Sequence, residues 1–87
     1  MGFLTLKTVP IGVVIRSRQK LLFAGNVAVV SSSNERGVFD ILPHHTNFVS
    51  LVKEYIEVVT SDRRRLRIQI ERGILRVKQN AVEVYVL

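Results

Sequence analysis

Apolar and polar residues alternate one by one along most of this chain. Leu66, Ile68 and Ile70 take every second position of residues 65–71, and valines do the same in residues 81–86. Successive side chains of a β-strand point to opposite faces, so each such run has one face to bury and one face to expose. No window of ten or more residues has a convincing helical pattern. The alternation therefore predicts an all-β protein.

Turn-forming residues separate the alternating runs at short intervals. Turns or loops are expected at residues 24–26, 31–34, 61–63 and 79–80, where Gly, Asn, Asp, Ser or Gln are grouped. Between them we expect about ten short strands, near residues 4–7, 11–16, 20–23, 27–31, 37–41, 47–52, 54–60, 65–71, 73–78 and 81–86. Many short strands with frequent turns are typical of a sandwich or a barrel.

The composition fits one folded domain. The chain has 87 residues, of which 47% are hydrophobic and 23% are charged, a balance typical of a packed globule and not of a disordered tail. We expect residues 1–87 to form a single domain. The absence of cysteine excludes disulfides and thiolate metal sites. No apolar run approaches the roughly 20 residues of a membrane-spanning helix, and the first residues do not resemble a signal peptide, so we expect a soluble protein.

Few residues could carry chemistry. Adjacent His44 and His45 point in opposite directions on an extended chain, and Glu35 and Asp40 are the nearest helpers, whereas a zinc site needs three or four converging ligands. The carboxylates form no paired pattern, the glycines are scattered singly, and the serines at residues 31–33 lack the glycines of a nucleophile elbow. We therefore expect no catalytic residue, no metal site and no cofactor, which indicates a protein that is not an enzyme.

Positive charge is concentrated in one segment. The formal net charge is +6, and residues 63–78 contain Glu71 as their one acid. The cations of that segment are Arg63, Arg64, Arg65, Arg67, Arg72, Arg76 and Lys78. With Tyr55 and Tyr85 as exposed aromatics, such a cluster suits single-stranded nucleic acid, so a basic β-module that binds nucleic acid is the alternative function. We favour the other interpretation, in which the arginines form a solvated sheet edge.

The segment from Gly37 to His45 has a structural interpretation of its own. Gly37 suits a turn position with positive φ. Phe39 and Ile41 share one strand face and are expected to enter the core. Pro43 cannot donate a ladder hydrogen bond, so it is expected to end the strand.

Three phrases of the sequence together resemble one family, the N-terminal domain of the epsilon subunit of F-type ATP synthases. They are Leu22-Phe23-Ala24-Gly25 followed by Val27 to Val30, then Gly37-x-Phe39-x-Ile41-Leu42-Pro43-x-His45, and finally Arg72-Gly73-Ile74-Leu75-Arg76-Val77 with Asn80-Ala81-Val82. The resemblance extends from about Ile11 to Leu87, and its specificity comes from the order and spacing of the phrases.

This resemblance implies a flattened β-sandwich of two sheets with about ten strands and a non-catalytic role. A member of the family lies at the foot of the central stalk, bound to the gamma subunit and resting on the c-ring, and helps to transmit rotation between proton flow and ATP synthesis. The implied location is the cytoplasmic face of the inner membrane, with membrane contact only through the complex. No small-molecule ligand is expected.

The resemblance also assigns positions in this sequence. Ser17 and His45 are expected to face the gamma subunit, and Glu35, Arg36, Gly37 and Val38 are expected to face the c-ring. The residues expected to be structural are Phe39, Ile41, Pro43 and Gly73.

Three departures from the family pattern stand out. The family usually continues into a C-terminal helical hairpin, and these 87 residues do not contain one, so we expect no helical brake and no nucleotide site. Val38, Asp40 and His44 replace an acidic residue, a glycine and a small residue that are common at those positions. Residues 1–9 extend beyond the usual start, where the expected strand at residues 4–7 would lie.

Overall fold

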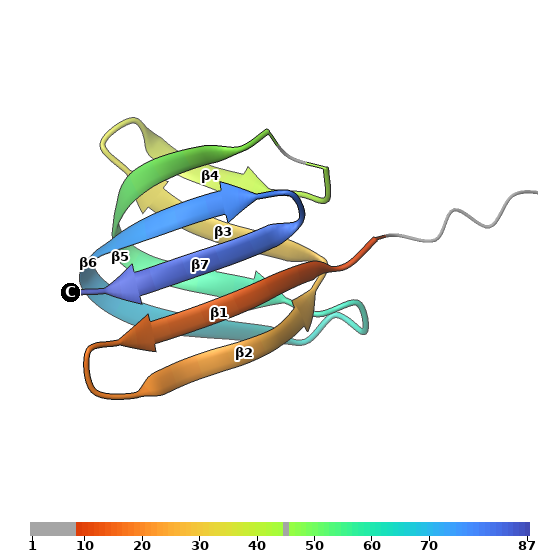
Figure 1. Cartoon of the computed structure of the whole chain (residues 1–87), viewed down its shortest axis with the longest axis horizontal. Helices are drawn as coiled ribbons and strands as arrows, with labels where there is room; N and C mark the ends of the chain where they lie inside the picture. Colours follow the sequence, from red (N-terminus) through yellow and green to blue (C-terminus); the bar gives the residue numbers. More distant parts are fainter. Residues whose placement is uncertain (1–8, 45) are drawn as a thin grey trace, which may run out of the picture.

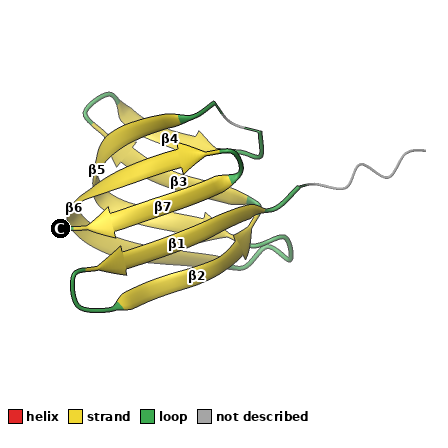
Figure 2. Cartoon of the chain, in the orientation of Figure 1, coloured by secondary structure: helices red, strands yellow, loops and turns green. Residues whose placement is uncertain are grey.

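The computed structural model describes residues 9–44 and 46–87, and it confirms that the chain is all-β (Figure 2). The seven strands are β1 (Ile11–Ser17), β2 (Leu21–Val27), β3 (Val29–Asn34), β4 (Gly37–Ile41), β5 (Phe48–Val59), β6 (Arg65–Lys78) and β7 (Ala81–Val86). Residues 9–44 and 46–87 contain no helix that is long and apolar enough to cross a membrane.

All seven strands belong to one hydrogen-bonded mixed sheet, in the order β2-β1-β7-β6-β5-β3-β4 (Figure 1). β1 and β7 run parallel, and the other neighbours are antiparallel. The described residues are all-β as predicted, but they form one mixed sheet of seven strands in place of the two sheets with about ten strands that the sequence suggested. Two pairs of expected strands are each one long strand, because residues 47–60 supply β5 and residues 65–78 supply β6. The expected strand at residues 4–7 lies outside the described residues.

β5 and β6 both continue through a bend, although the sequence at that bend is typical of a strand end. Lys53 pairs with Arg72 and Glu54 pairs with Ile70, so Glu71 is an extra residue in β6 and forms a bulge. A bulge bends a strand without ending its ladder. Glu54 has a φ of 75° at this point, and Figure 1 shows β5 and β6 curving over together at one end of the molecule.

This bend folds the sheet into two layers. One layer contains β2, β1, β7, the second half of β6 and the first half of β5, and the other contains β4, β3 and the remaining halves of β5 and β6. Each strand contributes to one cluster of buried residues: Ile11, Val13, Ile15, Val27, Val30, Ile41, Val52, Ile56, Val58, Leu75, Val77, Val82 and Val84. Because every strand buries side chains in the same cluster, the curved sheet encloses a single core.

Local turn propensity was misleading at two places and correct at two others. Residues 24–26, expected to form a turn, lie inside β2, because β1 supplies pairing partners such as Val13 for Gly25. Residues 31–34, expected to form a loop, extend β3, where the buried Ser32 donates its hydroxyl hydrogen bond to the carbonyl oxygen of Tyr55 at 2.7 Å. The turns at residues 61–63 and 79–80 are confirmed.

Candidate interaction face

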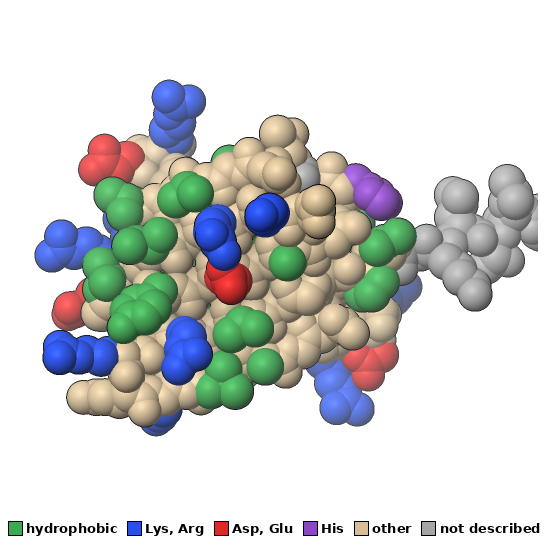
Figure 3. All heavy atoms as spheres, viewed as in Figure 1, with side chains coloured by type: hydrophobic (Ala, Val, Ile, Leu, Met, Phe, Trp, Pro, Cys, Tyr) green, Lys and Arg blue, Asp and Glu red, His purple; other side chains and the backbone are tan. Residues whose placement is uncertain are grey.

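One outer face of the molecule is formed by β1, β7, the second half of β6 and the first half of β5. Their outward-pointing side chains lie in two cross-strand rows, which are Arg16, Tyr85, Ile74, Leu51 and Val14, Glu83, Arg76, Val49. We call the surface of these eight residues the apolar face, because its five large hydrophobic side chains are between 37% and 72% exposed. Figure 3 shows hydrophobic side chains spread over this side of the molecule.

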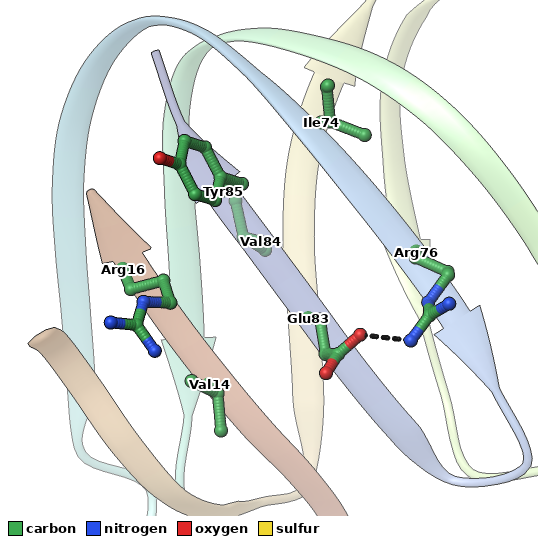
Figure 4. A pocket seen from close by; sticks show the side chains of 7 residues that line it. All are labelled: Val14, Arg16, Ile74, Arg76, Glu83, Val84 and Tyr85. Carbon is green, nitrogen blue, oxygen red and sulfur yellow. Dashed lines mark hydrogen bonds and ion pairs between the residues drawn. The ribbon is translucent and has the colours of Figure 1, made fainter. Parts of the chain in front are cut away.

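An ion pair lies at the centre of the apolar face. Arg76 and Glu83 are cross-strand partners, and the Arg76 guanidinium donates a hydrogen bond to Glu83 Oε1 (Figure 4). An open hollow of about 300 Å³ lies next to this pair, with Val14, Arg16 and Tyr85 among its lining residues (Figure 4). The pair removes net charge from the centre of the face, although so exposed a pair adds little stability. An exposed apolar surface of this kind is typical of a protein–protein interface.

The outer face of the other layer is polar. Glu57 in β5 accepts one hydrogen bond from Arg65 and one from Arg67, each at 2.9 Å. The Arg67 guanidinium also lies 4.1 Å from the centre of the Tyr55 ring. The hydrogen bond from Arg67, supported by Arg65, lowers the pKa of Glu57 against the opposing effect of its burial. Glu57, Arg65 and Arg67 are thus paired with one another within the chain.

These contacts bear on the alternative of nucleic-acid binding. Two arginines of the cluster at residues 63–67 are held by Glu57, and Arg64 Nε lies 3.2 Å from Asp62 Oδ2. Tyr55, one of the two aromatics expected to stack on bases, has Arg67 over its ring. Single-stranded nucleic acid needs free cations and open aromatic rings. The geometry therefore disfavours a nucleic-acid site at this hairpin.

Ser17, which the resemblance places toward the gamma subunit, is the last residue of β1. Its hydroxyl oxygen accepts hydrogen bonds from the backbone N–H groups of Gln19 and Lys20, both at 3.3 Å, and the hydroxyl donates to the Lys20 carbonyl oxygen at 3.4 Å. The side chain therefore closes the β1–β2 hairpin. Its role in partner binding stays a prediction.

His45, the other residue expected on that side, lies outside the described residues. The backbone N–H of its neighbour His44 donates to Asn80 Oδ1 at 2.7 Å, which fixes that residue near the β6–β7 turn. Within residues 9–44 and 46–87, no three His, Cys, Asp or Glu side chains are grouped so that they could hold a metal ion.

The residues expected at the c-ring, Glu35, Arg36, Gly37 and Val38, connect β3 to β4 and begin β4. Asn34 Oδ1 accepts a hydrogen bond from the Arg36 backbone N–H at 2.8 Å, and Gly37 has the positive φ expected of it, at 119°. All four residues are exposed, and Val38 is 71% exposed. The tight turn therefore presents its side chains to solvent, while a role at the c-ring stays a prediction.

The residues expected to be structural lie next to the core. Ile41 is fully buried, and half-buried Phe39 packs edge-to-face on Phe48, with ring centres 6.2 Å apart. β4 ends two residues before Pro43. Gly73 is buried beside the bend, and a side chain there would approach the Tyr85 carbonyl oxygen within 3.0 Å.

Comparison with known families decides the classification. The family model described as the β-sandwich domain of the ATP synthase delta/epsilon chain matches residues 11–87. The chain belongs to this family. Membership in the delta/epsilon family confirms the resemblance seen in the sequence and the prediction of a non-catalytic protein.

Solved structures show the same fold at low sequence identity. A chain of the Euglena gracilis mitochondrial ATP synthase, from a structure of its OSCP, F1 and c-ring in rotational state 1, is 16% identical with a TM-score of 0.82 over 97% of this chain. A chain from the central stalk and c-ring of the Tetrahymena thermophila mitochondrial ATP synthase is 15% identical with a TM-score of 0.73 over 93% of this chain. This delta/epsilon domain spans 59% and 66% of those two chains. The curated proteins contain no match to its sequence.

The apolar face of this delta/epsilon domain was not predicted from the sequence. The sequence indicates this face through pairs of adjacent apolar residues, such as Val13-Val14 and Ile74-Leu75. In each pair one side chain faces the core and the other faces outward. Alternation along a strand indicates which side chains face inward, but it does not indicate a function for apolar side chains that face outward.

Proposed function

We propose that this chain is a central-stalk subunit of an F-type ATP synthase that couples the gamma subunit to the c-ring. The family match over residues 11–87 carries the proposal. The occurrence of a chain with this fold in the central stalk and c-ring structure of the T. thermophila enzyme supports it. The subunit would associate with the membrane as part of the complex. The cytoplasmic side of an inner membrane remains a prediction, because both structures are of mitochondrial enzymes.

The apolar face is the surface that we assign to the gamma subunit. His44 is tied to Asn80 near the start of β1, and Ser17 lies at the other end of that strand. Five residue steps along a strand separate Gly12 from Ser17, a span of roughly 17 Å. A partner that reaches both Ser17 and His44 would therefore lie along the apolar face, which offers it hydrophobic side chains around a neutral centre.

The exposed turn of Glu35, Arg36, Gly37 and Val38 is the surface that we assign to the c-ring. The turn is fixed by the hydrogen bond from the Arg36 backbone to Asn34, so it can present its side chains without a large ordering cost. Val38 is apolar, and Arg36 forms no ion pair with any of the residues that the structure describes, so a contact here would combine hydrophobic packing with attraction to an acidic group.

A binding experiment with matched variants tests the proposal. The gamma subunit of the same organism is titrated with the chain, with Leu51→Asp on the apolar face, and with Gln69→Asp on the polar face. Both substitutions add one carboxylate at an exposed strand position. We expect a salt-resistant complex, at least about tenfold weaker binding for Leu51→Asp, and unchanged binding for Gln69→Asp.

Two results would contradict different parts of the proposal. Absence of any complex with gamma would mean that the family relationship is one of fold and not of role. Equal binding by the chain and both variants would keep the role but exclude the apolar face as the interface. Circular dichroism of each variant checks that the fold is retained.

A further inference from the structure

Cations without an ion-pair partner gather at one end of the molecule. This loop end contains the β1–β2 hairpin, the β3–β4 turn, the bend of β5 and β6, and the last residues of β7 (left in Figure 1). The ladder joins these parts, because Ser17 pairs with Val86, Val86 pairs with Gly73, and Ser33 pairs with Lys53.

Six of the chain's thirteen cations lie at the loop end: Arg16, Arg18, Lys20, Arg36, Lys53 and Arg72. Within the residues that the structure describes, none of the six forms an ion pair. Glu35, Glu54 and Glu71 lie at the same end, which leaves it a net charge of +3. Elsewhere in the described chain, the ion-paired cations are Arg64, Arg65, Arg67 and Arg76, and Arg63 and Lys78 are unpaired. The loop end therefore holds six of the eight cations that form no ion pair in the described part of the chain.

Exposed aliphatic side chains accompany these cations at three separate places. The pairs are Lys20 with Leu21, Arg36 with Val38, and Lys53 with Leu51. Leu21, Val38 and Leu51 are 57%, 71% and 72% exposed. In each pair the aliphatic residue is one or two positions from the cation, so three of the four parts of the loop end offer a positive charge and a hydrophobic side chain together.

We infer that the loop end binds a membrane surface that contains anionic phospholipids. The arginines and lysines contact lipid phosphates, and the neighbouring aliphatic side chains enter the boundary between headgroups and acyl chains, a combination that anchors peripheral proteins. Single-stranded nucleic acid is disfavoured, since its sites stack successive bases on aromatic rings. The loop end places aliphatic side chains beside three of its cations and an exposed ring, that of Tyr85, beside Arg16.

The inference does not depend on binding to the gamma subunit. At Arg36 and Val38 it overlaps the turn that we assign to the c-ring, whereas Arg18, Lys20 and Leu21 lie outside that turn.

Vesicle sedimentation with two charge-matched variants tests this inference. The full 87-residue chain is mixed with phosphatidylcholine vesicles that contain or lack phosphatidylglycerol, at low and at high salt. The loop-end variant is Arg18→Gln/Lys20→Gln/Arg36→Gln, and the control is Arg63→Gln/Arg64→Gln/Lys78→Gln, which removes as many charges elsewhere. We expect salt-sensitive binding that requires phosphatidylglycerol, weakened by roughly fivefold for each loop-end charge removed and much less in the control. Leu21→Ser/Val38→Ser is expected to weaken the binding that persists at high salt.

The possible outcomes separate the explanations. Equal weakening in the two triple variants would overturn the inference, because binding would then follow net charge alone. Binding that ignores phosphatidylglycerol would also overturn it, as would an oligonucleotide that binds through the loop-end cations while the vesicles do not. Retained binding of gamma by the loop-end variant would show that its fold is intact and that Arg18, Lys20 and Arg36 are not needed for the gamma interface.

Discussion

Glu57 links the polar face of the protein to pH. Its pKa is lowered below the ordinary value of 4.5, chiefly by the hydrogen bond from Arg67. The ion pairs of Glu57 therefore stabilise the fold above about pH 4.5, and this contribution is lost as the pH falls through the lowered pKa. We expect Glu57→Gln to be less stable than the native chain at neutral pH, with a smaller loss of stability on acidification.

Urea unfolding at a series of pH values measures this effect. Glu71→Gln is the control, since Glu71 is exposed in the bulge and forms no ion pair in the described part of the chain. A Glu57→Gln variant whose stability falls on acidification as steeply as that of the native chain would contradict the assignment.

The structure leaves little room for a side chain at Gly73. An added Cβ would lie 3.0 Å from the Tyr85 carbonyl oxygen and 3.4 Å from Val52 Cγ2. Because the backbone of β7 would have to move, Gly73→Ala is expected to cost about 1–3 kcal/mol in the free energy of unfolding. Gly12→Ala is the control, since its Cβ would have ordinary contacts, 3.7 Å from Asn26 Oδ1. Equal stability of the two variants in urea unfolding would exclude crowding at Gly73.

At the scale of elements, β4 is an edge strand that is held to the core by few side chains. Phe39 is half-buried and packs edge-to-face on Phe48 of β5. We expect Phe39→Ala to destabilise the fold by about 2–3 kcal/mol, at or below the lower end of the range for fully buried phenylalanines. Val38→Ala, at a 71% exposed neighbour, should change stability by less than about 0.5 kcal/mol. Urea unfolding of both variants measures the difference, and similar values would mean that β4 is held mainly by its backbone ladder.

Alternation along the sequence was sufficient to predict the strands but not their ends. It assigned Ile68 and Ile70 to the inward face, where both pack against the core. It could not distinguish a bulge from a turn at residues 53–54 and 71–72, because a bend and a strand end both interrupt the period of two. The glycine in residues 24–26 indicates a turn, yet the ladder with β1 makes the segment a strand. Pairing between strands that are distant in the sequence determines the structure at these residues, and the local sequence does not show which strands pair.

At the scale of the whole molecule, the contrast between the two outer faces could not be predicted from a single strand. The apolar face contains Val14, Ile74 and Leu51, which come from three strands. The order and register of the strands in the sheet place these residues close together. The same registers place Glu57 between Arg65 and Arg67 on the other layer. The family resemblance indicated partners without indicating this surface. Of the positions that it suggested, Ser17 ends β1 next to Arg16 of the apolar face, and the loop at Glu35 connects β3 and β4 of the other layer.

A small domain with one exposed apolar face should gain stability from a partner that covers it. A ligand present at 100 times its Kd adds about 2.7 kcal/mol to the free energy of unfolding, which corresponds to a rise in Tm of roughly 10–20 °C for a domain of this size. We expect the gamma subunit to raise the Tm of the chain and of Gln69→Asp by such an amount, and to raise that of Leu51→Asp much less. Tyrosine fluorescence of the isolated chain during heating gives the reference values. An unchanged Tm for the native chain at saturating gamma would contradict burial of the apolar face, because a partner that binds the folded state must stabilise it.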